Sequence, residues 1–372
     1  MEKLLEYLEQ NIRLEIEKYI EETKNDKQKN NEIEEIRLRN QRPIVLKTST
    51  RNIVLGHVVS TEEILQTFEK VCEHSIYSYQ KQICEGFITI KGGHRVGITG
   101  NCATENGKVI NINYISSLNF RVAREKKECS NNIIKYIIDG GEFVNTLIAS
   151  KPGCGKTTVL RDLVRKIGTG IEEYKMPPKT CGIVDERGEI ASMYKGVPQN
   201  DVGILSDVID NISKSDGMKI LIRSMAPEII ACDEIDSKED IDAITYAVCS
   251  GVKGIFTAHG NNMEELLVNN RIKELLEKNI IDTIIFLNDK KRGEIKDVYK
   301  LNKENKLYIK INFGSKTNFP EYNIMWKFII KGDKHNGNCK IHIFVFSIFR
   351  CKFFRKFDIK KIQKQSRWIK GF

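Results

Sequence analysis

The chain has 372 residues, which is long enough for two domains with separate cores. Its net charge of +10 comes from the carboxyl-terminal segment, because residues 313–372 hold 14 Lys and Arg against 3 Asp and Glu. The preceding part is nearly neutral. A nucleic-acid partner is therefore not expected. No segment reaches the about 18 consecutive apolar residues of a membrane span. The ten cysteines include no C-x-x-C pair and no zinc-like spacing with histidine, so neither a metal centre nor a redox pair is indicated.

The amino terminus is acidic and lacks the apolar segment of a signal peptide, so we expect a cytoplasmic protein, peripheral to a membrane at most. Residues 1–130 predict a small α+β domain. Its expected elements are a helix over 4–20, a loop over 21–31, strands over 35–39 and 43–48, a helix over 61–73 with a capping box beginning at Thr61, strands near 87–90 and 95–99, and a helix from Asn131 leading into the next domain.

The most informative segment is TLIASKPGCGKTT, at residues 146–158. An apolar strand runs into a glycine-rich turn and then into a helix, the layout in which backbone N–H groups surround phosphate oxygens. Lys156 is expected on the β- and γ-phosphates of ATP, and the Thr157 hydroxyl on Mg²⁺. The strict motif has glycine where this chain has Ser150. The predicted phosphate-binding residues are Ser150, Pro152, Gly153, Cys154, Gly155, Lys156, Thr157 and Thr158.

Two later apolar strands end in acidic pairs. Asp185 and Glu186 follow one, Asp233 and Glu234 follow the other, and both strands are predicted to be central and parallel. The second pair suits Mg²⁺ better, with Asp233 as the ligand and either Glu234 or Glu186 orienting the attacking water. A third strand, at residues 254–258, ends at His259, which could sense the γ-phosphate. Solvated turns for the acidic pairs, and a capping or core role for His259, remain open.

Seven segments occur together in the order of one known family. They are residues 33–43, 86–100, 115–125, 151–162, 184–191, 223–236 and 254–260. In this the chain resembles the stage III sporulation protein AA family, which is similar to the type II and type IV secretion ATPases. The resemblance covers roughly residues 1–312 and implies a RecA-like, doubly wound P-loop domain over residues 131–312.

The resemblance also implies roles for individual residues. Lys156 and Thr157 would bind nucleotide and Mg²⁺, Asp233 and Glu234 would form the second nucleotide motif, His259 would lie in a histidine box, and Glu186 in an acidic box. Arg121 and Arg124 resemble arginines that the amino-terminal domain supplies to the nucleotide, although surface ion pairs explain them equally well.

By the same resemblance the chain would be an ATP-hydrolysing motor that forms a homo-hexamer. It would act on the mother-cell side of a membrane-anchored sporulation protein. Two other functions stay open: a P-loop ATPase that acts on nucleic acid, and a nucleotide-gated assembly scaffold.

The family resemblance has ended before the carboxyl-terminal segment, residues 313–372, which is basic and aromatic. We expect a tail outside the folded core, either non-native or disordered. A membrane-binding surface and a nucleic-acid-binding surface are the alternatives.

Overall fold

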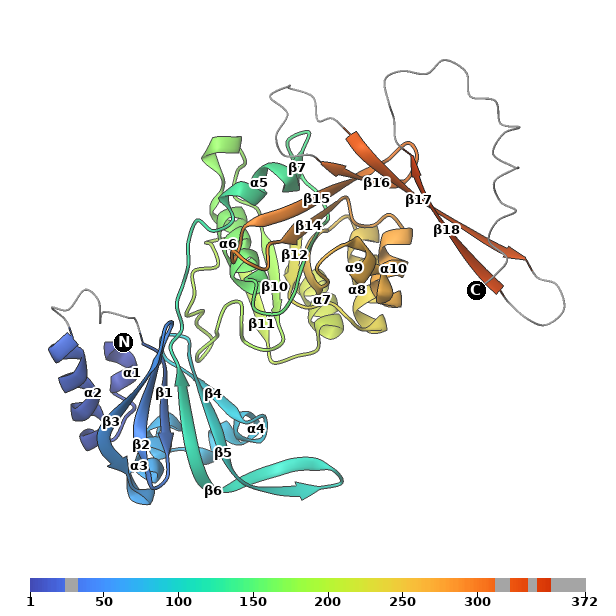
Figure 1. The fold of residues 1–372 in the computed structure, drawn as a ribbon. Coiled ribbons are helices and arrows are strands. Elements are labelled where there is room, and N and C mark those ends of the chain that lie inside the picture. Colours follow the sequence, from blue (N-terminus) through green and yellow to red (C-terminus); the bar gives the residue numbers. More distant parts are fainter. Residues whose placement is uncertain (24–32, 312–321, 334–339, 349–372) are drawn as a thin grey trace, which may run out of the picture.

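The computed structural model describes residues 1–23, 33–311, 322–333 and 340–348. These form two large sheets with flanking helices, and a small two-stranded sheet of β7 (Ile138–Asp139) and β8 (Glu142–Phe143) (Figure 1). The amino-terminal sheet has six strands in the order β3-β2-β1-β6-β5-β4. The second has ten strands in the order β11-β10-β12-β13-β9-β14-β15-β16-β17-β18.

The amino-terminal part is an antiparallel sheet covered by helices on one face. Its elements are α1 (Glu2–Leu5), α2 (Gln10–Thr23), β1 (Ile33–Arg39), β2 (Arg42–Thr48), β3 (Asn52–Val59), α3 (Thr61–Val71), α4 (Gln80–Cys84), β4 (Phe87–Ile90), β5 (His94–Glu105) and β6 (Lys108–Arg121). Buried apolar residues of α1, α2 and α3 pack with the sheet in one core. The opposite face is polar, and there Glu35 pairs with Arg37 at 2.6 Å and with Lys47 at 3.0 Å.

Three local expectations for this part were wrong. The helix predicted over 4–20 is two helices, because the Glu9 carboxylate accepts the N–H groups of Asn11 and Ile12, at 2.7 and 3.3 Å, and so starts a new helix. The capping box begins at Ser60, whose hydroxyl accepts the Glu63 N–H while Glu63 accepts the Ser60 N–H. Strand β3 was not predicted. Residues 21–23 of the loop predicted over 21–31 belong to α2, and the rest of that loop lies outside the described residues.

The second sheet is parallel from β11 to β14 and antiparallel beyond it. Its strands are β9 (Thr146–Ser150), β10 (Cys181–Asp185), β11 (Ser206–Asp210), β12 (Ile229–Cys232), β13 (Lys253–His259), β14 (Thr283–Leu287), β15 (Ile295–Asn302) and β16 (Leu307–Ile311). The central strands were predicted from their continuous apolar runs, and β9, β10 and β12 are buried along their whole length. The carboxyl ends of β9, β10, β12 and β13 lie at one edge of the sheet.

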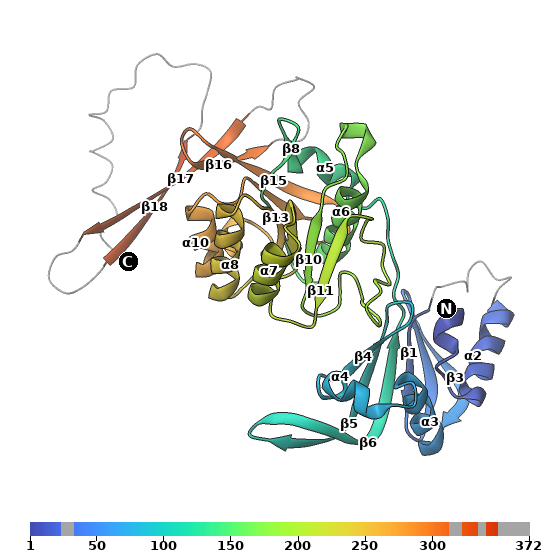
Figure 2. The same cartoon turned by 180° about the vertical axis from the view of Figure 1, so that it is seen from behind.

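Helices cover both faces of this sheet (Figures 1 and 2). On one face α5 (Asn131–Ile137) and α6 (Lys156–Thr169) belong to one core cluster. On the other, α7 (Lys214–Ser224), α8 (Lys238–Cys249), α9 (Met263–Val268) and α10 (Asn270–Glu277) belong to a second. Each side of the sheet therefore has its own core, as in a doubly wound fold.

Two strands of the carboxyl-terminal segment extend this sheet. β17 (Tyr322–Asp333) pairs with β16, and β18 (Lys340–Ile348) pairs with β17, both antiparallel. Both strands fall within residues 313–372, and the expected tail outside the folded core stays a prediction. The rest of the segment lies outside the described residues. Among the helices that the structure describes, none has both the length and the apolar character needed to cross a membrane.

The two parts of the molecule are in contact beside the end of β10. Arg95 of β5 pairs with Glu189 at 2.8 Å, and the Gly92 N–H donates to the Gln199 side chain at 2.8 Å. Glu73 contacts both Tyr194 and Lys195. The amino-terminal sheet thus touches the loop that carries the first acidic pair.

Candidate active site

The glycine-rich turn joins β9 to α6 in the predicted strand-turn-helix order. Gly153 and Gly155 have φ of 78° and 95°, a region that favours glycine, and no heavy atom lies within 4 Å of a Cβ built at Gly153. Gly155 is the N-cap of α6, so the first N–H groups of the helix are directed at the turn. This geometry fits a phosphate group. Ser150 is buried, and its hydroxyl donates to the Lys151 carbonyl at 2.9 Å, so serine is accommodated at the position where the motif has glycine.

The turn between β14 and β15 packs against the glycine-rich turn and supports it. The Gly293 N–H, between β14 and β15, donates to the Cys154 carbonyl at 3.0 Å, and Lys151 pairs with Asp289 at 3.5 Å. No sequence pattern indicates this support, because the two turns are more than a hundred residues apart.

Lys156 is buried at the start of α6, with 5% exposure. Its ammonium donates to the Ser150 carbonyl at 3.4 Å and to Nδ1 of His259 at 3.3 Å. Burial lowers the pKa of Lys156, and the nearby carboxylates of Asp233 and Glu234 oppose this shift. The lysine is therefore held at the mouth of the turn by two acceptors that a phosphate could replace.

Asp233 links the turn to the neighbouring strands. One carboxylate oxygen accepts the hydroxyl of Thr157, and the other accepts the hydroxyl of Thr257 on β13. Thr257 in turn accepts the N–H of Glu234 at 2.8 Å. Carboxylate and hydroxyl oxygens are the ligands that Mg²⁺ prefers. Asp233 and Thr157 thus form a donor set that fits the ion expected from the sequence.

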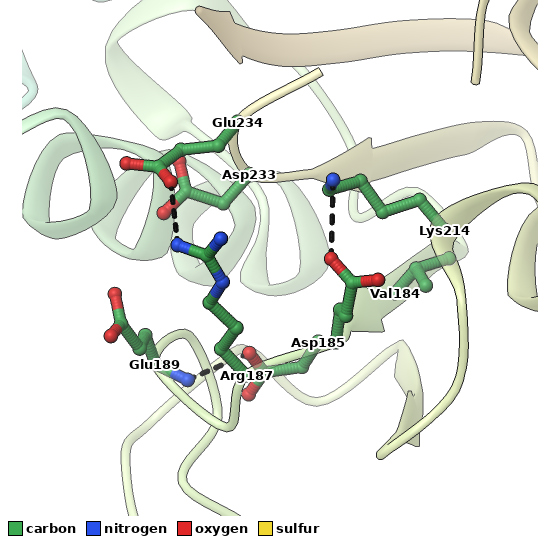
Figure 3. A pocket seen from close by; sticks show the side chains of 8 residues that line it. Val184, Asp185, Arg187, Glu189, Lys214, Asp233 and Glu234 are labelled. Atoms are coloured by element: carbon green, nitrogen blue, oxygen red, sulfur yellow. Dashed lines mark hydrogen bonds and ion pairs between the residues drawn. The ribbon is translucent and has the colours of Figure 1, made fainter. Parts of the chain in front are cut away.

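Glu234 lies at the end of β12 with a left-handed backbone, φ 53°. Its carboxylate contacts Nε2 of His259 at 3.2 Å. It also contacts Nη1 of Arg187 at 2.8 Å (Figure 3). Since His259 accepts from Lys156 at Nδ1, the proton on its ring belongs on Nε2, where it is donated to Glu234. Lys156, His259 and Glu234 therefore form one continuous chain of contacts.

Glu186 has a different partner. Its carboxylate pairs with the ammonium of the buried Lys214 at 3.1 Å. Lys214 also lies 3.6 Å from Asp240 and 3.7 Å from Asp236. Burial works against the charged form of Lys214, yet these carboxylates together raise its pKa. Glu186 is thus bound in an ion cluster with Lys214, the first residue of α7, and both residues line one pocket.

The loop after β10 is held rigidly by buried polar groups. Asp185 accepts the N–H groups of residues 189, 190 and 191 at 2.8, 3.0 and 2.8 Å. Burial raises the pKa of Asp185, and these N–H groups oppose the shift. Arg161 of α6 donates to the carbonyls of Ile190 and Glu189, at 2.8 and 2.5 Å. The helix that begins at the phosphate turn therefore also fixes the acidic loop.

The remaining predicted site residues lie further out. Arg121 is exposed at the end of β6, opposite Glu35 and Arg95 in the ladders, and Arg124 donates to the Ile33 carbonyl at 2.8 Å. These observations link both arginines to the amino-terminal sheet. Pro152 is exposed in the turn, Cys154 is buried, and Thr158 lies in the first turn of α6.

Four residues of the site were missed in the sequence: Arg161, Arg187, Lys214 and Thr257. Thr257 carried a weak signal, as the polar residue within an apolar strand. Arg187 follows Glu186 directly, but adjacency in sequence could not indicate that its partner would be Glu234.

The family model described as "Sporulation stage III, protein AA" matches residues 2–306. The chain belongs to this family. It is 38% identical over 269 residues to "Stage III sporulation protein AA" of Bacillus subtilis (strain 168), covering 72% of this chain and 87% of that protein. The resemblance inferred from the seven segments is confirmed.

Solved structures show the same fold. The ATPase DotB of Legionella pneumophila is 17% identical, with a TM-score of 0.50 over 73% of this chain and 78% of that one. DotB of Yersinia pseudotuberculosis is 14% identical, with a TM-score of 0.50 over 80% of this chain and 81% of that one. The predicted α/β fold, with a P-loop nucleotide-binding domain after a smaller α+β part, is confirmed.

Proposed function

We propose that this protein binds and hydrolyses ATP. The observation that carries the proposal is the meeting of Lys156 and Thr157, from the glycine turn, with Asp233, Glu234 and His259, from the ends of two neighbouring strands. A cation, a hydroxyl and carboxylates at one edge of a parallel sheet are the groups that phosphoryl transfer needs.

Each residue has a distinct task in this proposal. Lys156 exchanges its Ser150 and His259 contacts for β- and γ-phosphate oxygens, while the α6 N-terminus faces the same phosphates. Thr157 and Asp233 hold Mg²⁺, which when bound neutralises charge on the phosphates. Glu234 orients the attacking water, since it lies one residue from Lys156 in the chain of contacts, whereas Glu186 is bound to Lys214.

At the level of the cell we propose a motor of a secretion-like sporulation complex. It would work as a homo-hexamer at the cytoplasmic, mother-cell face of a membrane-anchored protein, peripheral to the membrane. Support comes from the family and from the shared fold with the ATPase DotB. Arg121 and Arg124 stay candidates for binding the nucleotide from the amino-terminal domain. A contact between either arginine and a bound nucleotide would test this role.

The deciding experiment is ATP turnover by the purified chain, together with its mass and symmetry with and without a non-hydrolysable ATP analogue. Turnover that needs Mg²⁺, and a hexamer favoured by the analogue, are the expected results. Absence of turnover under all these conditions would contradict the ATPase assignment. Turnover stimulated by DNA in a salt-dependent way would instead favour the nucleic-acid function.

Ending the chain at Asn312 should leave turnover within about twofold of the full-length value, because β14, β15 and β16 separate β17 from the strand that carries the phosphate turn. We propose that the ATPase core ends there. Turnover, solubility and the thermal midpoint of the truncated chain test this. Loss of soluble protein would show that residues 313–372 belong to the core, and loss only of binding to anionic vesicles would identify a membrane surface.

A further inference from the structure

Arg187 is an exposed side chain on a rigid loop. The loop is held by Asp185 and Arg161, whereas the side chain of Arg187 has 62% exposure. Within the described residues, the partner that the structure gives it is Glu234, at 2.8 Å. Only the side chain therefore needs to move for Arg187 to change partner.

The position of Arg187 brings a second cation to the phosphate site. Glu234 separates it from His259, and His259 contacts Lys156, the residue placed at the β- and γ-phosphates. Figure 3 shows the guanidinium directed across the pocket toward Glu234 and Asp233. Lys214, the other cation lining this pocket, is already bound by its three carboxylates.

We propose that Arg187 binds the terminal phosphate of the nucleoside triphosphate, giving up its ion pair with Glu234 to do so. The exchange is favourable because an exposed ion pair contributes little, whereas a guanidinium forms two parallel hydrogen bonds to phosphoryl oxygens. Glu234 is then free to orient water only when a terminal phosphate is present. This inference rests on the proposed ATPase function.

Under this proposal Arg187 contributes to the affinity for a nucleoside triphosphate but not to the affinity for a diphosphate. ADP has no terminal phosphate to attract Arg187, so the Arg187–Glu234 pair persists and the side chain adds nothing to ADP affinity. Arg187 is therefore the residue that makes the protein bind its substrate more tightly than its product.

The test measures the affinity of the full chain for ADP and for a non-hydrolysable ATP analogue. Arg187→Ala should weaken binding of the analogue by about tenfold or more, as for loss of a charged hydrogen bond, and change ADP binding less than about twofold. Arg187→Lys keeps the charge without the planar fork and should fall between. Arg13→Ala is the matched control, because Arg13 also pairs with a glutamate at 2.8 Å, on α2.

Each outcome has one meaning. If the wild-type chain binds neither nucleotide, the proposed function fails. If it binds both, and Arg187→Ala keeps the wild-type ratio of the two affinities, the inference about Arg187 is wrong while the ATPase assignment stands. Faster turnover in Arg187→Ala than in the wild type would also overturn it, because Arg187 would then only restrain Glu234.

Discussion

Lys156→Ala should lower ATP turnover at least about 10²-fold, the scale of loss when one contact to developing charge is removed. In the proposed site this side chain is the cation of the turn that would face the phosphates, and its ammonium lies 3.3 Å from His259. The fold should survive, because burial already disfavours the charged lysine and the Thr157–Asp233 contact does not depend on it. Steady-state turnover and thermal midpoint are the measurements.

Two further variants separate charge from packing. Lys156→Met keeps the length of the buried chain and should lose turnover to the same extent. Lys166→Ala, at the other end of α6, removes a lysine that pairs with Glu128 at 2.7 Å, and should leave turnover unchanged. Wild-type turnover in Lys156→Ala would remove the basis of the proposed site.

The nucleotide half of the fold was predictable because its signals are local. Continuous apolar runs marked β9, β10 and β12 as buried parallel strands, and glycine spacing marked the turn between β9 and α6. The carboxyl ends of such strands meet at one edge, so the sequence alone placed the acidic pairs and His259 near the turn. The turn's contacts with Asp233 and His259 follow from this rule.

What could not be predicted depends on contacts between distant segments. Glu9 reads as an ordinary helix residue, yet its carboxylate caps α2 and its N–H donates to Thr67 on α3, 58 residues away, at 3.1 Å. β3 alternates between less and more exposed residues at the edge of its sheet, which gives a weak pattern. The sequence does not show whether Glu186 or Glu234 orients the attacking water. Their contacts in the structure differ, because Glu186 pairs with Lys214 and Glu234 with His259.

This difference in partners predicts different effects for two matched substitutions. Glu234→Gln keeps the shape of the side chain and removes its charge, so nucleotide should still bind while hydrolysis falls about 10²- to 10⁴-fold, the range for loss of a positioned acid or base. Glu186→Gln should stay within about threefold of the wild-type rate, because Lys214 retains Asp240 and Asp236 as partners.

Nucleotide affinity and single-turnover rates on both variants decide between the two carboxylates. Single-turnover rates are needed because they separate the chemical step from product release. If only Glu186→Gln lowers the single-turnover rate, Glu186 of the acidic box orients the water. This result would require Glu186 to leave Lys214 when ATP binds. Normal rates in both variants would exclude either carboxylate as the group that orients water. A loss confined to Glu234→Gln would instead identify the residue that the contacts of His259 and Arg187 already single out.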